Sequence, residues 1–255
     1  MTSEGDEIGH EADEDDGILR HASAYHAPVL WHTVVRDLIT DREGVYVDGT
    51  LGGGGHTAAL LAALSRAGRV IGIDRDAAAI KEAGQRLSDE EAAGRLTLVH
   101  GRFGDVSAHL DTLGIKQVDG LLLDLGISSH QVDLPERGFS YMAEGALDMR
   151  MNQAAGPSAS DVINEWPERD LAQLFFEFGE EPGSRRIARA IVAARPLSTT
   201  RELADVVRSV VPGREEVKTL SRVFQALRIV VNQELAELEQ ALEGAAEEFA
   251  GAYGG

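Results

Sequence analysis

The sequence predicts an α/β fold: a parallel sheet with helices on both faces, and an all-helical block inserted after the sheet. Two observations lead to this prediction. Short apolar runs recur about every 25 residues with helical patterns between them, as in βα units. After residue 125 the pattern changes and no convincing strand follows. With 255 residues, 43% of them hydrophobic, the chain is long enough to bury such a core.

Four short apolar runs are the predicted strands. They are residues 45–47, 70–73, 96–99 and 120–123. None shows the alternation of a half-exposed strand, so each is expected to be buried on both faces. Helical patterns at residues 57–66 and 77–87 lie between the first three runs. This alternation is typical of parallel strands joined by crossover helices.

The region after the fourth strand is predicted to be helical. Residues 168–178 have a helical pattern that ends at Gly179. Thr199 and Glu202 have the spacing of a capping box, which marks the start of another helix. From residue 219 to residue 242 apolar side chains recur at helical spacing, which predicts one long amphipathic helix.

These elements predict three parts of the chain. Residues 1–22 are expected to be a disordered acidic tail, because residues 1–20 hold eight acidic side chains and one arginine. Residues 23–134 and 218–255 are expected to form the core that contains the sheet. Residues 135–217 are expected to form an inserted helical domain for substrate recognition.

The charge distribution bears on nucleic-acid binding. The net charge of −19 argues against a nucleic-acid partner, because phosphates are repelled by an acidic surface. Residues 182–201, however, carry five arginines and no acidic side chain. This basic strip is either a solvated helix face or a surface that contacts RNA.

Several classes of protein are excluded by what the sequence lacks. Without cysteine there are no disulfides and no thiolate metal sites. The longest apolar run, residues 58–64, is far shorter than a membrane helix, and the acidic N-terminus has no apolar signal core. No His, Asp and Glu cluster has metal-ligand spacing. We therefore expect a cytoplasmic protein with no membrane or metal partner.

A glycine-rich loop follows the first predicted strand. Residues 48–56 read DGTLGGGGH, and glycines there let the backbone approach a ligand closely. The second strand ends at Asp74, 19 residues after Gly55, where a carboxylate can accept hydrogen bonds from ribose hydroxyls. A purely structural turn would explain the loop but not this acid. The pattern predicts a site for an adenosine-type cofactor.

Charge favours one cofactor over another. The spacing of Gly53, Gly55 and Ala58 fits the dinucleotide pattern loosely, so NAD(P) stays open. Asp48 and Asp124, however, end the first and fourth strands and bring carboxylates to the edge where ligands bind. Carboxylates repel a pyrophosphate but attract the sulfonium and amino groups of S-adenosylmethionine.

Eight ordered segments carry a family resemblance. They are DGTLGGGGH (48–56), IDRD (73–76), HGRF (100–103), LLDLGISS (122–129), ERGFS (136–140), LDMRM (147–151), RIARA (186–190) and FQALRI (224–229), with Gln131 and Asn232 besides. Over about residues 25–245 the sequence resembles the bacterial small-subunit rRNA (cytosine-N4)-methyltransferases of the RsmH/MraW type.

The resemblance implies a class I, Rossmann-like methyltransferase core interrupted by a helical substrate domain. It implies S-adenosylmethionine as cofactor, 16S rRNA of the small ribosomal subunit as partner, and the exocyclic N4 of a decoding-region cytidine as target. The residues that match the family's cofactor pocket are Gly54, Gly55, His56, Asp74, Phe103, Asp124 and Gln131. Phe103 is implied beside the adenine, with an ordinary core position as the alternative. His56 either lines the pocket or caps a helix.

Asp124 is the predicted catalytic residue. The lone pair of a cytosine amine is delocalised into the ring, so an acceptor on its N–H bonds would favour the tetrahedral nitrogen needed for attack. We expect Asp124 to contact either the amino-acid end of the cofactor or the target amine.

RNA contacts are predicted on arginines, because guanidinium groups bind phosphates. The candidates are Arg137, Arg150, Arg185, Arg186 and Arg189. The target base must leave its stack to reach the methyl group. Phe139, Tyr141 or Trp166 could stack on it, with a core position as the alternative for each.

The C-terminal end departs from the family pattern. In the family the long helix leads into further strands, whereas this sequence ends with EFAGAYGG at residues 248–255. Either the sequence is a truncated version whose core lacks its last strands, or another chain covers the sheet edge that these strands would pair with. We favour truncation. Two rival functions stay open. An NAD-dependent oxidoreductase would need a hydride-transfer acid or base that the sequence does not clearly offer, and a non-catalytic RNA-binding or assembly module would need neither.

Overall fold

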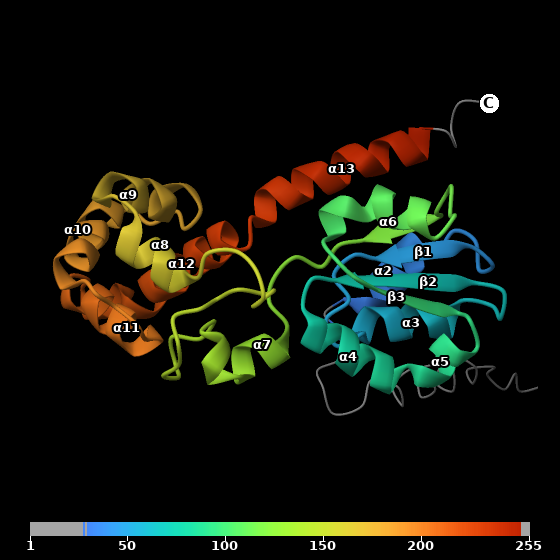
Figure 1. Ribbon diagram of the computed structural model, residues 1–255, viewed down its shortest axis with the longest axis horizontal. Helices are drawn as coiled ribbons and strands as arrows, with labels where there is room; N and C mark the ends of the chain where they lie inside the picture. Colours follow the sequence, from blue (N-terminus) through green and yellow to red (C-terminus); the bar gives the residue numbers. More distant parts are fainter. Residues whose placement is uncertain (1–27, 29, 251–255) are drawn as a thin grey trace, which may run out of the picture. The chain divides into compact units, whose positions relative to one another are not determined.

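The computed structural model describes residue 28 and residues 30–250, which form two compact units (Figure 1). The sheet unit comprises residues up to 102, residues 106–125 and residues from 245 onward. The helical unit comprises residues 103–105 and 126–244. The predicted acidic tail at residues 1–22 lies outside the described residues.

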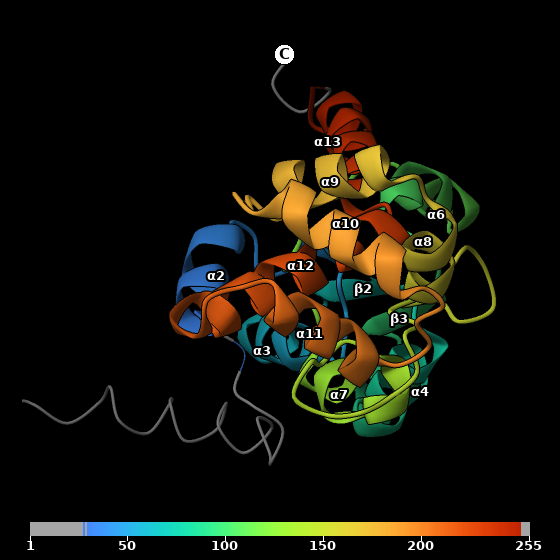
Figure 2. The same cartoon turned by 90° about the vertical axis from the view of Figure 1, so that its left-hand side faces the viewer.

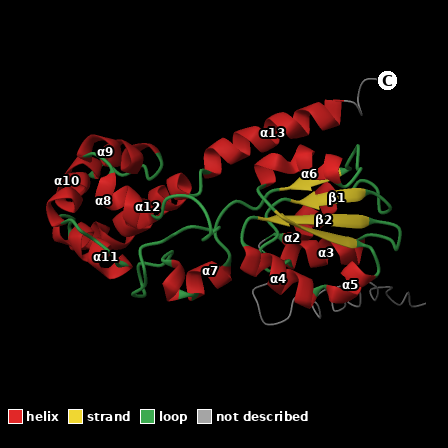
Figure 3. Ribbon diagram, in the orientation of Figure 1, coloured by secondary structure: helices red, strands yellow, loops and turns green. Residues whose placement is uncertain are grey.

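The sheet unit contains four parallel strands in the order β3-β2-β1-β4. Figure 3 draws strands as yellow arrows. The strands are β1 (Val45–Asp48), β2 (Arg69–Asp74), β3 (Leu96–His100) and β4 (Gly120–Leu122). The helices are α2 (Trp31–Leu38), α3 (Gly55–Ala63), α4 (Ala77–Arg86), α5 (Ser88–Ala92) and α6 (Val106–Thr112). The predicted α/β fold with a parallel sheet is confirmed, and each strand ends within one residue of its predicted bounds.

Both faces of the sheet are buried, as the continuous apolar runs predict. Tyr46 and Val70 point to the face that packs with apolar side chains of α2 and α3. Their neighbours in the chain, Val47 and Ile71, point to the opposite face and pack with Val106 and other apolar side chains of α6 and the segment after it. Alternate residues of the strands therefore enter separate cores, which is why Thr97 of the outer strand β3 is the one polar side chain between the ends of these four strands.

Helices make up the helical unit, and the last of them extends beyond the boundary of the unit at residue 244. They are η1 (Phe103–Asp105), α7 (Ser129–Asp133), η2 (Pro135–Arg137), α8 (Ala159–Glu165), α9 (Glu168–Glu177), α10 (Ser184–Ala194), α11 (Thr200–Ser209), η3 (Gly213–Glu215), α12 (Glu216–Val231) and α13 (Glu234–Ala250). Helices α8 to α12 gather in Figure 2, and their buried side chains form one cluster. The predicted capping box is present: Thr199 accepts from the backbone of Glu202, and Glu202 accepts from the backbone of Thr199.

The long helix predicted from residue 219 to residue 242 is wrong in one respect, because it is two helices. Helix α12 ends at Val231 and α13 begins at Glu234, with Gln233 at φ 53° between them. At the break Asn232 is buried, accepts from Met151 N at 2.8 Å and donates to Met149 O at 2.8 Å. The Asn232 side chain thus forms hydrogen bonds with a loop that is distant in sequence, at the point where the helix ends.

The observed units also differ from the predicted boundaries around α12. The prediction assigned residues 218–255 to the sheet-containing core, whereas the units divide at residue 245. Leu220, Val223 and Leu227 of α12 are fully or almost fully buried in the same cluster as α9 and α10. The apolar face that the spacing predicts is real, but it belongs to the helical unit.

Gly179 follows α9 at the predicted place, for a different reason. Its φ is not positive; the next residue, Glu180, takes φ 50° instead. A Cβ on Gly179 would lie 2.7 Å from the carbonyl oxygens of Phe175 and Arg222. The position requires glycine because the turn after α9 passes closely along the backbone of α12.

In the described part of the chain, no helix combines the length and apolar character that a membrane span requires. The cytoplasmic location expected from the sequence stays a prediction.

Asn232 offers a test of the α12–α13 break. Replacing Asn232 with Leu leaves the buried N–H of Met151 and the buried C=O of Met149 without their partner, and each unmade hydrogen bond costs about 1–3 kcal/mol. We expect Asn232→Leu to lower the free energy of unfolding by at least about 2 kcal/mol in urea titrations. The control is Gln225→Leu, because Gln225 is exposed on the same helix. Equal stability of Asn232→Leu and wild type would contradict this account.

Candidate functional site

The candidate site lies where the order of the strands reverses. From β1 the chain proceeds outward to β2 and β3, and then returns to place β4 on the other side of β1. The carboxyl ends of β1 and β4 are therefore neighbours, with Asp48 paired to Leu122. In open parallel sheets the loops that follow two such strands diverge and leave a crevice for a ligand. The glycine loop follows β1 here, and Asp124 follows β4.

The glycine loop contains two residues in the left-handed backbone region, which glycine adopts without steric cost. Gly52 and Gly54 take φ 49° and 74°, and Gly54 is the residue before the first turn of α3. Leu51 N donates to Ile73 O at 3.0 Å, which fixes the loop against the end of β2. Gly55 is the first residue of α3. The predicted cofactor residues Gly54 and Gly55 thus stand at the start of a helix at the carboxyl edge of the sheet.

Asp48 is buried and forms hydrogen bonds within the glycine loop and the start of α3, instead of facing a ligand. It is 1% exposed, and its two carboxylate oxygens accept from Thr57 Oγ1 at 2.7 Å and Thr50 N at 3.2 Å. Burial raises the pKa of Asp48, and the hydrogen bond from Thr57 opposes that rise. The expectation that Asp48 meets a cationic ligand directly is therefore wrong, because the side chain is enclosed within the loop it supports.

Asp74 joins the end of β2 to the same loop. Its carboxylate accepts from Gly52 N and from Asp76 N, each at 2.8 Å. Burial raises its pKa, against the lowering effect of these two hydrogen bonds. An ionised carboxylate has about four lone-pair sites, so Asp74 keeps acceptor capacity beyond these two bonds. That capacity is what the predicted contact with ribose hydroxyls requires.

Asp124 and His56 are brought together across the switch point. The side chain of Asp124 is 63% exposed, and its Oδ2 lies 3.4 Å from Nε2 of the buried His56. The hydrogen bond from His56 is the main cause that lowers the pKa of Asp124, although partial burial opposes it. Thr50 Oγ1 accepts from Asp124 N at 2.7 Å and so holds the backbone at this point.

This contact bears on the two interpretations of His56. Helix α3 has no side-chain cap at its N-terminus, so His56 faces Asp124 instead of capping the turn. Its other ring nitrogen, Nδ1, is buried and has no hydrogen-bond partner among the described residues. A buried polar nitrogen without a partner at such an edge is a group that a ligand can satisfy.

Two predicted cofactor residues belong to the helical unit. Gln131 is buried in α7, where its side chain accepts from Ser128 N at 3.1 Å and completes a capping box. Phe103 begins η1 and is half-buried. The backbone of η1 is held by α13, since Gly104 N donates to Glu237 Oε1 at 3.3 Å. A cofactor role for Phe103 and Gln131 stays a prediction, whereas Gly54, Gly55, His56, Asp74 and Asp124 all lie in the sheet unit.

The structure corrects part of the predicted RNA surface. Arg137 is 5% exposed and donates through Nη2 to the carbonyl oxygens of Arg150 and Met151. It therefore holds the loop after η2 together instead of facing solvent. Arg150 pairs with Asp148 at 2.7 Å, which largely neutralises its charge. Sequence patterns could not distinguish these roles, because they depend on a loop that folds back on itself.

The arginines of the basic strip at residues 182–201 have two kinds of position: some bond to other parts of the protein, and others are exposed. Arg195 donates to the carbonyl oxygens of Ile163 and Trp166, at the end of α8. Arg201 pairs with Glu144 at 2.7 Å. The three arginines at the start of α10 are exposed; they are Arg185, Arg186 and Arg189. Of the five predicted RNA contacts, these three keep the surface position that such a contact needs.

The predicted stacking residues pack into the helical core. Phe139 is 6% exposed, and Trp166 packs against the same cluster. Tyr141 stands edge-on to Phe224, with its hydroxyl 2.9 Å from Ser221 Oγ. Phe176, which was not predicted as a functional residue, is 63% exposed at the end of α9. The signal was present in the helical spacing, because Phe175 and Phe176 cannot both point inward.

No group of three or more His, Cys, Asp or Glu residues in the described part of the chain could hold a metal ion. The expected absence of a metal stays a prediction.

Comparison with known proteins identifies the family. The MraW methylase family pattern matches residues 23–252. The chain belongs to the MraW methylase family. It is 49% identical over 239 residues to a protein named ribosomal RNA small subunit methyltransferase H from Chlorobium luteolum, covering 88% of this chain and 72% of that protein.

Two further relatives bear the same name. The protein from Chlorobium phaeovibrioides is 52% identical over 235 residues, which is 86% of this chain and 71% of the relative. The protein from Paramagnetospirillum magneticum is 50% identical over 224 residues, which is 86% of this chain and 69% of the relative. The resemblance inferred from eight short segments is confirmed over most of the chain.

Thr57 tests the role of Asp48. Thr57→Val removes the hydrogen bond to a buried carboxylate, and we expect a loss of about 1–3 kcal/mol at pH 7. This bond favours the ionised form of Asp48, whose pKa burial raises. Its contribution is therefore present above that pKa and is lost as acidification protonates the carboxyl. Urea titrations at several pH values should show the loss shrinking as the pH falls.

The control for this series is Thr112→Val. Thr112 Oγ1 donates at 2.8 Å to the neutral carbonyl of Ala108 on an exposed helix. Its effect should be small and independent of pH, since no titrating acceptor is involved. A loss from Thr57→Val that is equal at every pH would show that Asp48 is not the ionised partner.

Proposed function

We propose that the protein transfers a methyl group from S-adenosylmethionine to the exocyclic N4 of a cytidine in the decoding region of 16S rRNA. Membership of a methylase family supports the reaction class. Relatives about 50% identical, named ribosomal RNA small subunit methyltransferase H, support a small-subunit rRNA substrate. The cofactor and the N4 position rest on the family resemblance and on the chemistry of the site.

One observation carries the choice of cofactor: an exposed carboxylate beside the glycine loop that is ionised at neutral pH. Asp124 is 63% exposed at the switch point, and its pKa is held low by His56. A pyrophosphate next to this charge would be repelled, whereas a cation is attracted. The site thus fits an amino-acid sulfonium better than a nicotinamide dinucleotide.

The residues of the sheet unit fit S-adenosylmethionine in three further respects. Asp74 has spare acceptor capacity for ribose hydroxyls, and buried His56 Nδ1 lacks a partner among the described residues. Gly54 and Gly55 would take the backbone close to the ligand at the start of α3. When bound, S-adenosylmethionine supplies a methyl group on a positively charged sulfur.

The chain's own contribution to the chemistry centres on Asp124. Because the carboxylate stays ionised, it can accept a hydrogen bond from an amino group and hold it in one orientation. That amino group is either the α-amino group of the cofactor or the N4 amine of the cytidine. Thr50 and His56 fix the backbone and the side chain of Asp124, so little reorganisation is needed when the ligand arrives.

Asp124→Ala tests this proposal. A charge-assisted hydrogen bond contributes about 1.5–3 kcal/mol, or about tenfold to a hundredfold. If Asp124 holds the cofactor, calorimetric titration should show the dissociation constant for S-adenosylmethionine rising by this factor. If it holds the target amine, that constant should stay unchanged and kcat for methylation of small subunits from a methylase-deficient strain should fall.

The control for this test is Asp111→Ala, since Asp111 is an exposed carboxylate of the same unit in α6. It should leave both quantities unchanged. Full turnover by Asp124→Ala with unchanged cofactor affinity would exclude Asp124 from both roles. Tight binding of NADH without binding of S-adenosylmethionine would overturn the proposed function itself.

A further inference from the structure

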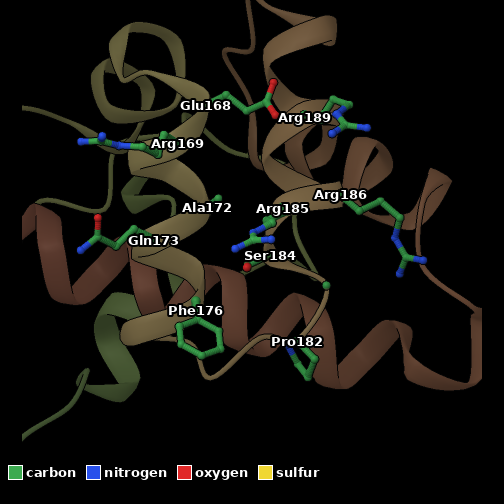
Figure 4. A pocket seen from close by; sticks show the side chains of 11 residues that line it. Glu168, Arg169, Ala172, Gln173, Phe176, Pro182, Ser184, Arg185, Arg186 and Arg189 are labelled. Carbon is green, nitrogen blue, oxygen red and sulfur yellow. Dashed lines mark ion pairs between the residues drawn. The ribbon is translucent and has the colours of Figure 1, made fainter.

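The helical unit contains an open groove between α9 and α10 (Figure 4). Its volume of about 1140 Å³ exceeds the ~300–1,000 Å³ of small-molecule pockets, so its size suits a polymer segment. In Figure 4 Arg185 lies between the two helices, Phe176 and Pro182 lie toward one end, and Glu168 and Arg189 lie toward the other. The groove is formed within one unit, so its geometry does not depend on the sheet.

The groove is basic in an otherwise acidic chain. Four arginines and one glutamate line it; they are Arg169, Arg185, Arg186, Arg189 and Glu168. Among the residues that the structure describes, no carboxylate lies within ion-pair distance of Arg185 or Arg186. Arg189 and Glu168 are 3.7 Å apart and exposed, which makes their pairing weak. The chain as a whole has a net charge of −19, so this local excess of positive charge is distinctive.

Phe176 gives the groove an apolar surface that folding does not explain. Of the Phe, Tyr and Trp side chains whose burial the structure describes, which leaves out Phe249, Phe176 alone is exposed. The other face of α9 is well packed, since Leu171, Leu174 and Phe175 are at most 3% exposed. Residues 169, 172, 173 and 176 line the groove and recur with the spacing of one helix face. The exposed ring is thus part of a continuous surface with the arginines.

We infer that this groove binds a single-stranded segment of the RNA substrate, with arginines on its phosphates and a base stacked on Phe176. The inference rests on the proposed function for the identity of the RNA. Planar guanidinium groups bind phosphate oxygens in pairs, and an aromatic ring accepts the face of any base. The combination of free guanidinium groups with a solvent-exposed ring is the chemistry that recognises unpaired nucleotides.

The exposed ring is what favours a single strand over a duplex. In double-stranded RNA the base faces are covered by their neighbours, so proteins contact mainly phosphates and 2′-hydroxyls there. A ring such as Phe176 contributes to binding only when a base is unstacked. The groove is accordingly a site for nucleotides that flank the target cytidine.

The test uses the full chain and two fluorescein-labelled probes: a single-stranded 12-nucleotide RNA and a duplex of the same length. Phe176→Ala should weaken binding of the single strand about tenfold and leave the duplex almost unchanged, because it removes only stacking. Its matched control is Val217→Ala, which removes an exposed apolar side chain elsewhere in the helical unit. That control should bind as the wild type does.

The double variant Arg185→Gln/Arg186→Gln tests the binding of phosphates by these two guanidinium groups. For a single strand, the slope of log K against log salt concentration is negative, and its magnitude falls by about 0.7 for each phosphate that the protein no longer neutralises. A decrease in magnitude of about 1.4 is therefore expected. Phe176→Ala should keep the wild-type slope. The matched control is Arg214→Gln, since Arg214 is exposed outside the groove. Its slope should equal that of the wild type.

Three results would overturn the inference. In the first, both groove variants bind the single strand with wild-type affinity. In the second, the control variants lose as much affinity as the groove variants do. In the third, polyglutamate displaces the single strand at a lower concentration than unlabelled RNA does. The last result would indicate an acidic protein segment as the occupant.

The inference and the proposed function can fail separately. Binding of S-adenosylmethionine and methylation of small subunits are measured on the same variants. Groove variants should bind the cofactor as the wild type does but show a raised KM for the subunit. If the groove variants are active and their KM for the subunit is unchanged, RNA binding by the groove is refuted and the proposed function is not. Groove-dependent RNA binding by a wild type that transfers no methyl group would refute the proposed function alone.

Discussion

The position of β1 between β2 and β4 is the constraint on which the candidate site depends. Parallel pairing on both sides of β1 puts the carboxyl ends of three strands at one edge. Asp48, Asp74 and Asp124 stand at those ends although they are far apart in sequence. Any register shift in β1 would move its alternate side chains to the wrong face and separate these carboxylates. The apolar cores on both faces of the sheet therefore determine where the three carboxylates lie at its carboxyl edge.

The three carboxylates have different tasks because they are buried to different extents. Asp48 is enclosed, so its carboxylate contacts other groups of the protein and accepts hydrogen bonds from Thr50 and Thr57. Asp74 is partly exposed and connects the loop to β2. Asp124 is mostly exposed and stays ionised beside His56. A fully buried carboxylate is difficult to keep charged, whereas an exposed one can meet a cationic ligand with little desolvation.

The sequence predicted the sheet well, because each strand is an apolar run whose burial is a local property. It predicted the cofactor edge for the same reason, since the carboxylates directly follow those runs. It could not predict that Asn232 ends α12, because its partners at Met149 and Met151 lie more than eighty residues away. It could not show that Arg137 is buried, or that Tyr141 packs edge-on against Phe224. Those outcomes depend on which loops and helices meet in the folded chain.

The acidity of the chain gives the groove its selectivity. Phosphates are repelled wherever carboxylates dominate the surface, so RNA gains little from contact with most of this protein. At the start of α10, Arg185 and Arg186 have no carboxylate within ion-pair distance among the described residues, so their charge is available to a ligand. The acidic surface repels RNA and the groove attracts it. Together they raise the difference in affinity between RNA bound in the groove and RNA bound elsewhere on the protein. A uniformly basic surface would bind RNA more tightly but in many orientations, and only a few of these would bring a cytidine to Asp124.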